Sequence, residues 1–214
     1  MPELKEKLLL KRSLDHVFFS NPVLVGGLVI GQLAAGATNL QNGVALTVTF
    51  FFVTLPVLVF AAACGRFLPR WSRIIAYMLI SGAMLFPAYL VCRSISPTIL
   101  DSVGVYLPLL AVSTVPALYS ARFSESHPVS VAFFDGVFLT VGFGLVAAVL
   151  GAAREFFGSG SLWGVKLASQ SFHAVSLPFW GFILLGFMAA GVSGIRILLK
   201  LPDYVPPVEE GEAE

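Results

Sequence analysis

The chain has 214 residues, of which 57% are hydrophobic and 12% are charged, and its formal net charge is +1. An ordinary soluble domain carries about 25% charged residues, so this composition excludes a soluble core of this length. The charge balance gives no reason to expect nucleic-acid binding, and Cys64 and Cys92 form neither a metal-ligand nor a disulfide pattern. The chain is therefore predicted to be an all-α integral membrane protein.

The hydrophobic stretches predict six transmembrane helices. Residues His16 to Gly65 contain no Asp, Glu, Lys or Arg. A spanning helix needs about 20 apolar residues, so this stretch holds two spans and a turn. Later charge-poor stretches supply four more. The predicted spans cover residues 22–38, 44–64, 74–95, 102–120, 129–153 and 177–199.

Two flanking segments enclose the predicted membrane domain of residues 21–200. Residues 1–20 interleave charged and apolar side chains, and this pattern predicts an amphipathic segment on the cytoplasmic interface. Residues 201–214 form an acidic tail that is expected to be disordered. Ten of the 13 Lys and Arg residues fall on one side of the six-span arrangement, which places both termini in the cytoplasm.

The first and fourth predicted spans contain features that interrupt helices. The first is rich in glycine and has Gln32 at its centre, whereas the fourth has Pro108 and Pro116 with Ser113 and Thr114 between them. Irregular backbone at membrane depth is tolerated only where protein or a cavity surrounds it. Each of these spans opens a set of three, and an odd number of spans inverts the second set. The sequence thus favours a 3+3 inverted repeat with interrupted first and fourth helices, the alternative being glycines that only form a helix-packing face.

Several short motifs resemble those of a known family. They are Asn21–Val25 entering the first span, Gly104–Leu110 in the fourth, Asp135-Gly136 and Val141–Gly144 in the fifth, Arg154–Leu162 after it, and Pro178 opening the sixth. The sequence resembles the membrane subunits of the Rnf and Nqr electron-transport complexes, and more specifically the Rnf E/Nqr D type, over about residues 8–199. The pattern Arg-Glu-x-x-Gly-x-Gly-Ser-Leu at 154–162 is the most specific piece.

The resemblance implies a non-catalytic integral subunit of a bacterial-type inner-membrane complex that couples redox chemistry to Na⁺ or H⁺ translocation. It implies an inverted homologous partner of the Rnf A/Nqr E type, together with other redox subunits. In the family, cysteines in the interrupted spans of the two partners hold an iron centre. Here those cysteine positions are occupied by Gly31 and Thr114. The chain is therefore expected to bind no cofactor alone, and iron or a 2Fe-2S cluster would need partner ligands.

A few polar residues inside the predicted spans are candidates for an ion pathway or a polar core. Asp135 is the only acidic residue well inside a span. It is predicted to be a cation or proton site, or else a hydrated group near the cytoplasmic interface. Gln32 is predicted to hydrogen-bond the freed backbone of the fourth span, where Ser113 and Thr114 lie.

The charged and glycine-containing segment after the fifth span has two interpretations. The sequence predicts an interfacial turn in which Arg154 and Glu155 cap the helix end and Gly158 and Gly160 shape the turn. The alternative is a docking surface for a partner subunit.

A second function class remains open. A paralogue without the cluster cysteines could work as a redox-independent small transporter or channel-like protein built on the same inverted repeat. Asp135 would then be the coupling or substrate site.

Overall fold

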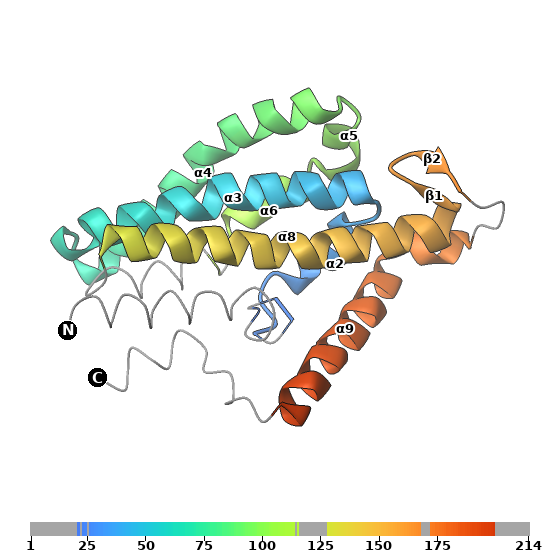
Figure 1. Cartoon of the computed structure of the whole chain (residues 1–214). Coiled ribbons are helices and arrows are strands. Elements are labelled where there is room, and N and C mark those ends of the chain that lie inside the picture. The colour runs from blue at the N-terminus through green and yellow to red at the C-terminus, as the bar shows by residue number, and fades with distance from the viewer. Residues whose placement is uncertain are drawn as a thin grey trace.

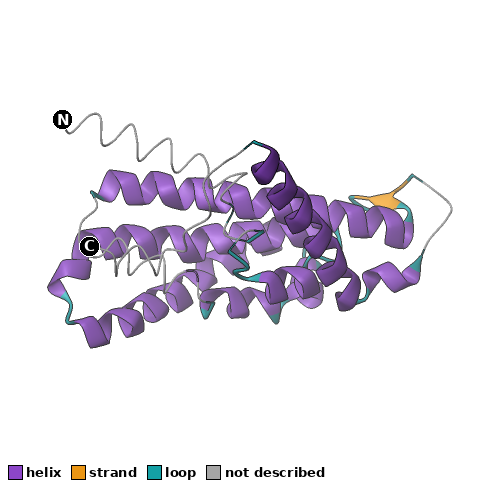
Figure 2. Ribbon diagram, turned by 90° about the horizontal axis from the view of Figure 1, so that it is seen from below, coloured by secondary structure: helices purple, strands orange, loops and turns teal. Residues whose placement is uncertain are grey.

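The computed structural model describes residues 21, 23–24, 26–113, 115, 128–167 and 172–199. Within these residues the molecule is helical apart from one short hairpin (Figures 1 and 2). The predictions for the amphipathic segment 1–20 and the acidic tail 201–214 lie outside the described residues.

Four helices in the described residues are long and apolar enough to cross a membrane. They are α3 (Leu40–Cys64), α4 (Arg70–Ile95), α8 (Val129–Ser159) and α9 (Pro178–Leu198). The 3₁₀ turn η1 (Gly65–Phe67) joins α3 to α4. In Figure 1, α3 and α8 run side by side through the middle of the bundle, and α9 leaves it obliquely.

The remaining two predicted spans are represented by short helices. The first corresponds to α2 (Ile30–Gly36), and the fourth corresponds to α5 (Ile99–Val103) and α6 (Tyr106–Ala111). A Cβ atom built on Gly36 would lie 3.3 Å from Tyr106, so α2 and α6 are in direct contact. The chain before α2 forms turns, with positive φ at Gly27 (67°) and Val29 (61°). Such a φ is strained for a β-branched residue, so Val29 marks a sharp break.

Two hydrogen bonds show at what depth these irregular segments lie. The Asn21 side chain donates to the Gly142 carbonyl of α8 (2.9 Å), and the Ser81 hydroxyl of α4 donates to the Ala111 carbonyl at the end of α6 (2.7 Å). Gly142 lies about 20 Å from the first residue of α8 and about 25 Å from its last, at 1.5 Å per residue. Ser81 likewise lies near the middle of α4. The turns before α2 and the end of α6 therefore lie near the middle of the bundle.

The core is centred on the contact between α3 and α8. Glycines let these two backbones approach closely: a Cβ on Gly43 would lie 2.6 Å from the Ala147 carbonyl oxygen, and one on Gly151 would lie 2.5 Å from that of Asn39. Phe50 and Phe143 stack between the helices with ring centroids 4.3 Å apart.

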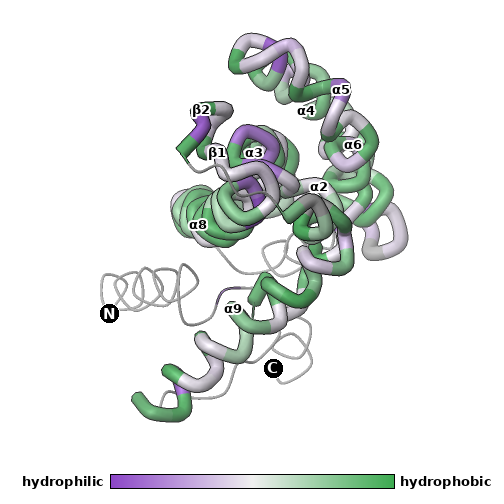
Figure 3. Tube along the Cα trace, turned by 90° about the vertical axis from the view of Figure 1, so that its right-hand side faces the viewer, coloured by the Kyte–Doolittle hydropathy of each residue, from purple (hydrophilic) through white to green (hydrophobic). Residues whose placement is uncertain are grey.

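The outer helices leave most of their apolar side chains exposed. In the 18-residue apolar stretch of each long helix, only 17% of α4 and 17% of α9 is buried inside the molecule, against 50% of α3 and of α8. Figure 3 shows hydrophobic residues along α4, α8 and α9, with hydrophilic residues near β2 and the start of α3. The exposed faces of α4 and α9 therefore suit lipid or partner helices.

Several predicted boundaries are wrong. The helix α3 begins at Leu40 rather than at residue 44, because the Asn39 side chain accepts the backbone N–H of Asn42 (2.7 Å) and caps the helix start. The helix α4 begins at Arg70, directly after Pro69, rather than at residue 74. The helix α8 continues to Ser159 instead of ending at residue 153. The prediction for α9 agrees within one residue at each end.

Candidate functional site at the turn between α2 and α3

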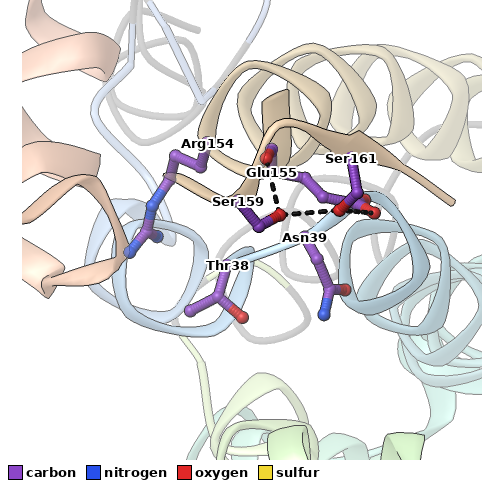
Figure 4. Close-up of a pocket in the computed structure, with 6 residues that line it drawn as sticks. All are labelled: Thr38, Asn39, Arg154, Glu155, Ser159 and Ser161. Carbon is purple, nitrogen blue, oxygen red and sulfur yellow. Dashed lines mark hydrogen bonds between the residues drawn. The ribbon is translucent and has the colours of Figure 1, made fainter. Parts of the chain in front are cut away.

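A polar pocket of about 400 Å³ lies where α2 gives way to α3 (Figure 4). Three parts of the chain line it: the α2–α3 turn, the last two turns of α8, and the strand β1 (Ser161–Leu162), which pairs with β2 (Val165–Lys166). The lining residues are Thr38, Asn39, Arg154, Glu155, Ser159 and Ser161.

Arg154 joins α8 to two other elements through backbone carbonyls. Its side chain is completely buried (0% exposed). Nη1 donates to the carbonyl oxygens of Ala34 (2.6 Å) and Ala37 (3.1 Å), at the end of α2. Nε donates to Val175 (3.2 Å) in η2 (His173–Ser176), and Nη2 donates to Leu177 (3.2 Å), immediately before α9. A helix ends with carbonyls that lack intrahelical partners, so Arg154 satisfies groups that would otherwise be buried without one.

Glu155 accepts hydrogen bonds from free backbone N–H groups, including one at the start of α3. It is 7% exposed, and its Oε2 accepts the backbone N–H of Leu40 (3.0 Å), the first residue of α3. Its Oε1 accepts the backbone N–H of Gly164 (2.8 Å) and the hydroxyl of Ser161 (3.3 Å), both in the hairpin. Carboxylates are favoured at helix N-termini and cations at C-termini, because of the charges on the free backbone groups there. Arg154 therefore binds the end of α2 and Glu155 binds the start of α3, on either side of the α2–α3 turn. We call this pair of residues the Arg154–Glu155 clamp.

The two glycines of the same motif end the helix. Gly158 is buried in the last turn of α8, and Gly160 follows the helix with φ 65°, its N–H donating to the Phe156 carbonyl (3.0 Å). A left-handed residue at this place is the common glycine-dependent helix stop. The expected interfacial turn begins at Gly160 rather than at Arg154.

The structure therefore corrects the prediction for Arg154 and Glu155. Both lie inside α8 and are buried, so neither belongs to the predicted interfacial turn, and the alternative of a docking surface stays a prediction. Charged residues after a long apolar run commonly mark the end of a span, but here tertiary hydrogen bonds let the helix continue. The motif spacing identified the residues but not their partners on α2 and α3, which lie more than 100 positions away.

A second polar cluster ties the same turn to α5. The Asn42 side chain donates to the Thr38 hydroxyl (2.8 Å), and its carbonyl oxygen accepts the hydroxyl of Ser102 (2.9 Å). Asn42 belongs to the polar turn predicted between the first two spans, and Ser102 is the first residue of the predicted fourth span, but no contact between them was predicted. Through these hydrogen bonds, the α2–α3 turn in the first half of the predicted repeat is joined to α5, at the start of the second half.

The candidate polar residues of the core do not gather in this pocket. Asp135 lies in the second turn of α8 and is 3% exposed, at the far end of that helix from Arg154. Ser113 is buried, and its hydroxyl donates to the Leu110 carbonyl (2.7 Å) at the end of α6. Gln32 is half-buried on α2 and makes no hydrogen bond to the described residues. Thr114 lies outside the described residues. The roles predicted for these side chains stay predictions.

The described residues do not fit an iron site of the kind that the resemblance implies. Gly31 has no side chain, and a Cβ placed on it would meet nothing within 4 Å. No group of three or more His, Cys, Asp or Glu in the described part of the chain could hold a metal ion. Cys92 is buried against Thr49 and Ala45, near the start of α3, whereas Cys64 ends that helix. About 28 Å of helix separates Ala45 from Cys64, so the two thiols cannot bind the same metal ion.

Comparisons with known proteins decide the family. The family model described as "Rnf-Nqr subunit, membrane protein" matches residues 9–197. The chain belongs to the Rnf-Nqr family of membrane subunits. This membership confirms the resemblance drawn from the motifs.

Curated relatives match over most of their length. The chain is 29% identical over 201 residues to the E subunit of an ion-translocating oxidoreductase complex of Shewanella amazonensis, covering 86% of this chain and 87% of that protein. It is 27% identical over 173 residues to the E subunit of a proton-translocating ferredoxin:NAD(+) oxidoreductase complex of Clostridium ljungdahlii (79% and 81%). It is 27% identical over 197 residues to the D subunit of a Na(+)-translocating NADH-quinone reductase of Psychromonas ingrahamii (90% and 93%).

Proposed function

We propose that this Rnf-Nqr protein is an integral, non-catalytic subunit of an ion-translocating oxidoreductase complex, of the E/D type. The observation that carries the proposal is the family match across residues 9–197. The relatives are subunits of such complexes, and the chain matches each of them over most of its length. The four long apolar helices, and the glycine at position 31 where the family has a cysteine, support a scaffold rather than a redox carrier.

The proposed architecture is a six-span 3+3 inverted repeat whose first and fourth spans are broken. In support, α2 begins and α6 ends near the middle of the bundle, and the two short helices touch at Gly36 and Tyr106. The basic residues further favour cytoplasmic termini in a bacterial-type inner membrane.

The proposed partner is an inverted homologue of the A/E type, accompanied by redox subunits. Gly31 is exposed on α2, and the half-buried amide of Gln32 lies beside it. An amide that faces hydrocarbon without a hydrogen bond costs several kcal/mol, on the order of 2–7. A polar group of the partner would remove this cost. Any iron held at such an interface would depend on the partner's ligands.

Affinity purification of the tagged full-length chain from its own membranes tests this function. We expect a second membrane protein of the same family to co-purify in a fixed ratio, together with redox subunits. A chain that purifies alone, stable and monodisperse, contradicts the proposal.

The burial of Asp135 supports a second candidate function, a redox-independent transporter or channel. Asp135 is 3% exposed inside a membrane-length helix, and buried carboxylates at such positions commonly mark ion or proton pathways. A redox-independent transporter or channel would use Asp135 as its coupling site. Vesicles that contain the purified chain alone distinguish the two: ion or proton flux without any electron donor, abolished by Asp135→Asn, favours the transporter.

A further inference from the structure

The hairpin that follows α8 carries an unusual turn residue. The strands β1 and β2 are joined by Trp163 and Gly164 alone, with φ of 55° and 78°. Positive φ at both loop positions is the pattern of a type I′ turn, which favours Asn, Asp or Gly. A tryptophan in the left-handed region is strained, and such outliers concentrate at functional contacts.

The register of the hairpin points its apolar side chains away from the protein. Ser161 pairs with Lys166, and Leu162 pairs with Val165. Side chains of paired residues share a face, and neighbouring pairs alternate between faces. Ser161 faces the pocket, where its hydroxyl reaches Glu155, so Leu162 and Val165 face outward. Val165 is 63% exposed and Trp163 is 45% exposed.

Further exposed hydrophobic side chains surround the hairpin. They come from the last turns of α8 and from the chain between β2 and α9, and they are Phe156, Phe157, Leu167 and Phe172. In Figure 1 the hairpin lies at the end of the bundle where α8 ends, opposite the turn between α3 and α4. Exposed apolar patches of this kind mark an interaction surface.

The helix lengths place this surface at the level of the lipid headgroups. The 31 residues of α8 span about 46 Å, whereas the hydrocarbon core is about 30 Å thick and the bilayer with its headgroups about 40–45 Å. Glu155 lies level with Leu40, where α3 begins, and the hairpin follows one turn further along α8. The hairpin is therefore outside the hydrocarbon and close to the headgroups.

The opposite end of the bundle carries a matching set of residues. Trp71 and Phe67 are exposed there, and the guanidinium of Arg66 lies over the Phe67 ring at 4.8 Å. Tryptophan beside basic residues at both ends of an apolar bundle is the pattern of the two interfacial belts of a membrane protein. At the hairpin, Trp163 and the exposed Lys166 supply the same combination.

From these observations we propose that the β1–β2 hairpin is a lipid anchor: Trp163, Leu162 and Val165 insert into the headgroup region. The anchor holds the Arg154–Glu155 clamp at a fixed depth in the membrane, because Gly164 and Ser161 of the hairpin donate hydrogen bonds to Glu155. A lipid surface suits this hairpin better than a protein partner, because the matching belt at the other end requires only a bilayer.

Spin-label accessibility tests the anchor in the full-length chain, purified with whatever subunits accompany it. The chain carries Cys64→Ser, buried Cys92 stays, and the label is placed at Val165→Cys in nanodiscs of phosphatidylcholine and phosphatidylglycerol. Leu79→Cys, exposed in the middle of α4, is the deep control, and Thr98→Cys, in the loop after α4 at the same bundle end, is the water control.

We expect the label at 165 to collide with oxygen more often than with a water-soluble nickel chelate, at a ratio between those of the two controls. Trp163→Ser should lower this ratio severalfold by releasing the hairpin into water, while Trp163→Phe should preserve it. A label at 165 that behaves like the one at 98 places the hairpin in water and overturns the proposal. If the label at 165 rarely collides with either reagent, a protein covers the hairpin, and this result also overturns the proposal. So does a collision ratio that is unchanged in Trp163→Ser.

Discussion

At Arg154 a single guanidinium serves four backbone carbonyls that belong to two different parts of the chain. Only arginine offers five donors in a rigid planar fork, whereas lysine offers three donors on one rotating nitrogen. The four carbonyls converge on this side chain from the end of α2 and from the segment that leads into α9. Arg154 therefore acts as a structural fastener of the broken first span.

Arg154→Gln is expected to destabilise the folded chain strongly. The shorter amide cannot reach all four carbonyls. The Leu177 carbonyl keeps the backbone N–H of Trp180 (3.2 Å), but a buried carbonyl left without a donor costs about 1–3 kcal/mol, so loss of the other bonds is expected to cost on the order of 3 kcal/mol or more. Denaturant unfolding in mild detergent measures it. Arg154→Lys should fall between the two.

The control for this measurement is Arg93→Gln, in the exposed last turn of α4. It should change the free energy of unfolding by less than about 0.5 kcal/mol. Equal effects at positions 93 and 154 would contradict the fastening role.

Gly160→Ala tests the helix stop. Because Gly160 has φ 65°, a Cβ there should cost about 1–2 kcal/mol in unfolding free energy. Gly186→Ala is the matched control, since that glycine lies within α9 and a Cβ on it would meet nothing within 4 Å. Alanine at 186 should be neutral or stabilising by up to about 1 kcal/mol. The prediction is wrong if the two substitutions have the same sign and size.

At the scale of whole elements, the contact between α3 and α8 positions both ends of the clamp. Leu40 begins α3 and Glu155 lies near the end of α8, so any change in the helix separation moves the two apart. The glycines on this contact set the separation, because no other residue admits backbone atoms so close.

Gly43→Leu is therefore expected to push α8 away from α3. Overpacking of a tight contact costs about 1–3 kcal/mol, and the separation should also weaken the bond between Glu155 and Leu40. Hydrogen exchange at the Leu40 amide should become faster, alongside a lower unfolding midpoint. Gly82→Leu on the open face of α4 should leave both quantities unchanged.

The elements differ in how well the sequence predicts them. The helix α9 is predicted within one residue because Pro178 starts it, Arg196 lies in its last turn and Lys200 follows its end. The start of α3 and the end of α8 are predicted wrongly because Gln41, Asn42, Arg154 and Glu155 are polar, and polar residues commonly end a transmembrane span. Hydrogen bonds of Asn42, Arg154 and Glu155 to distant residues let the helices continue through them, and no local pattern contains that information.

At the scale of the molecule, the α2 region is held by hydrogen bonds from Arg154 and Asn21 and by packing against α6 and α9. A glycine at position 31 offers no thiolate, so the fold of this chain is not expected to depend on a metal. Family membership could be predicted from motifs, but this fastening by backbone carbonyls could not.

Removal of metal should accordingly leave the stability of the purified chain unchanged. The unfolding midpoint with and without a strong iron chelator is expected to agree, since structural metals stabilise only folds that ligate them. Iron content is measured in the same samples. Stoichiometric iron in the chain alone, with a lower midpoint after chelation, would refute both this prediction and the proposed lack of ligands.

The bonds on α2 also fix an order of events during translation. Asn21 and Gly142 are 121 positions apart, and Ala34 and Arg154 are 120 apart. The seven residues of α2 rise only about 10 Å, too short to cross the lipid alone. On the ribosome, the nascent first span must therefore wait for most of the polypeptide to be made before it reaches its final place.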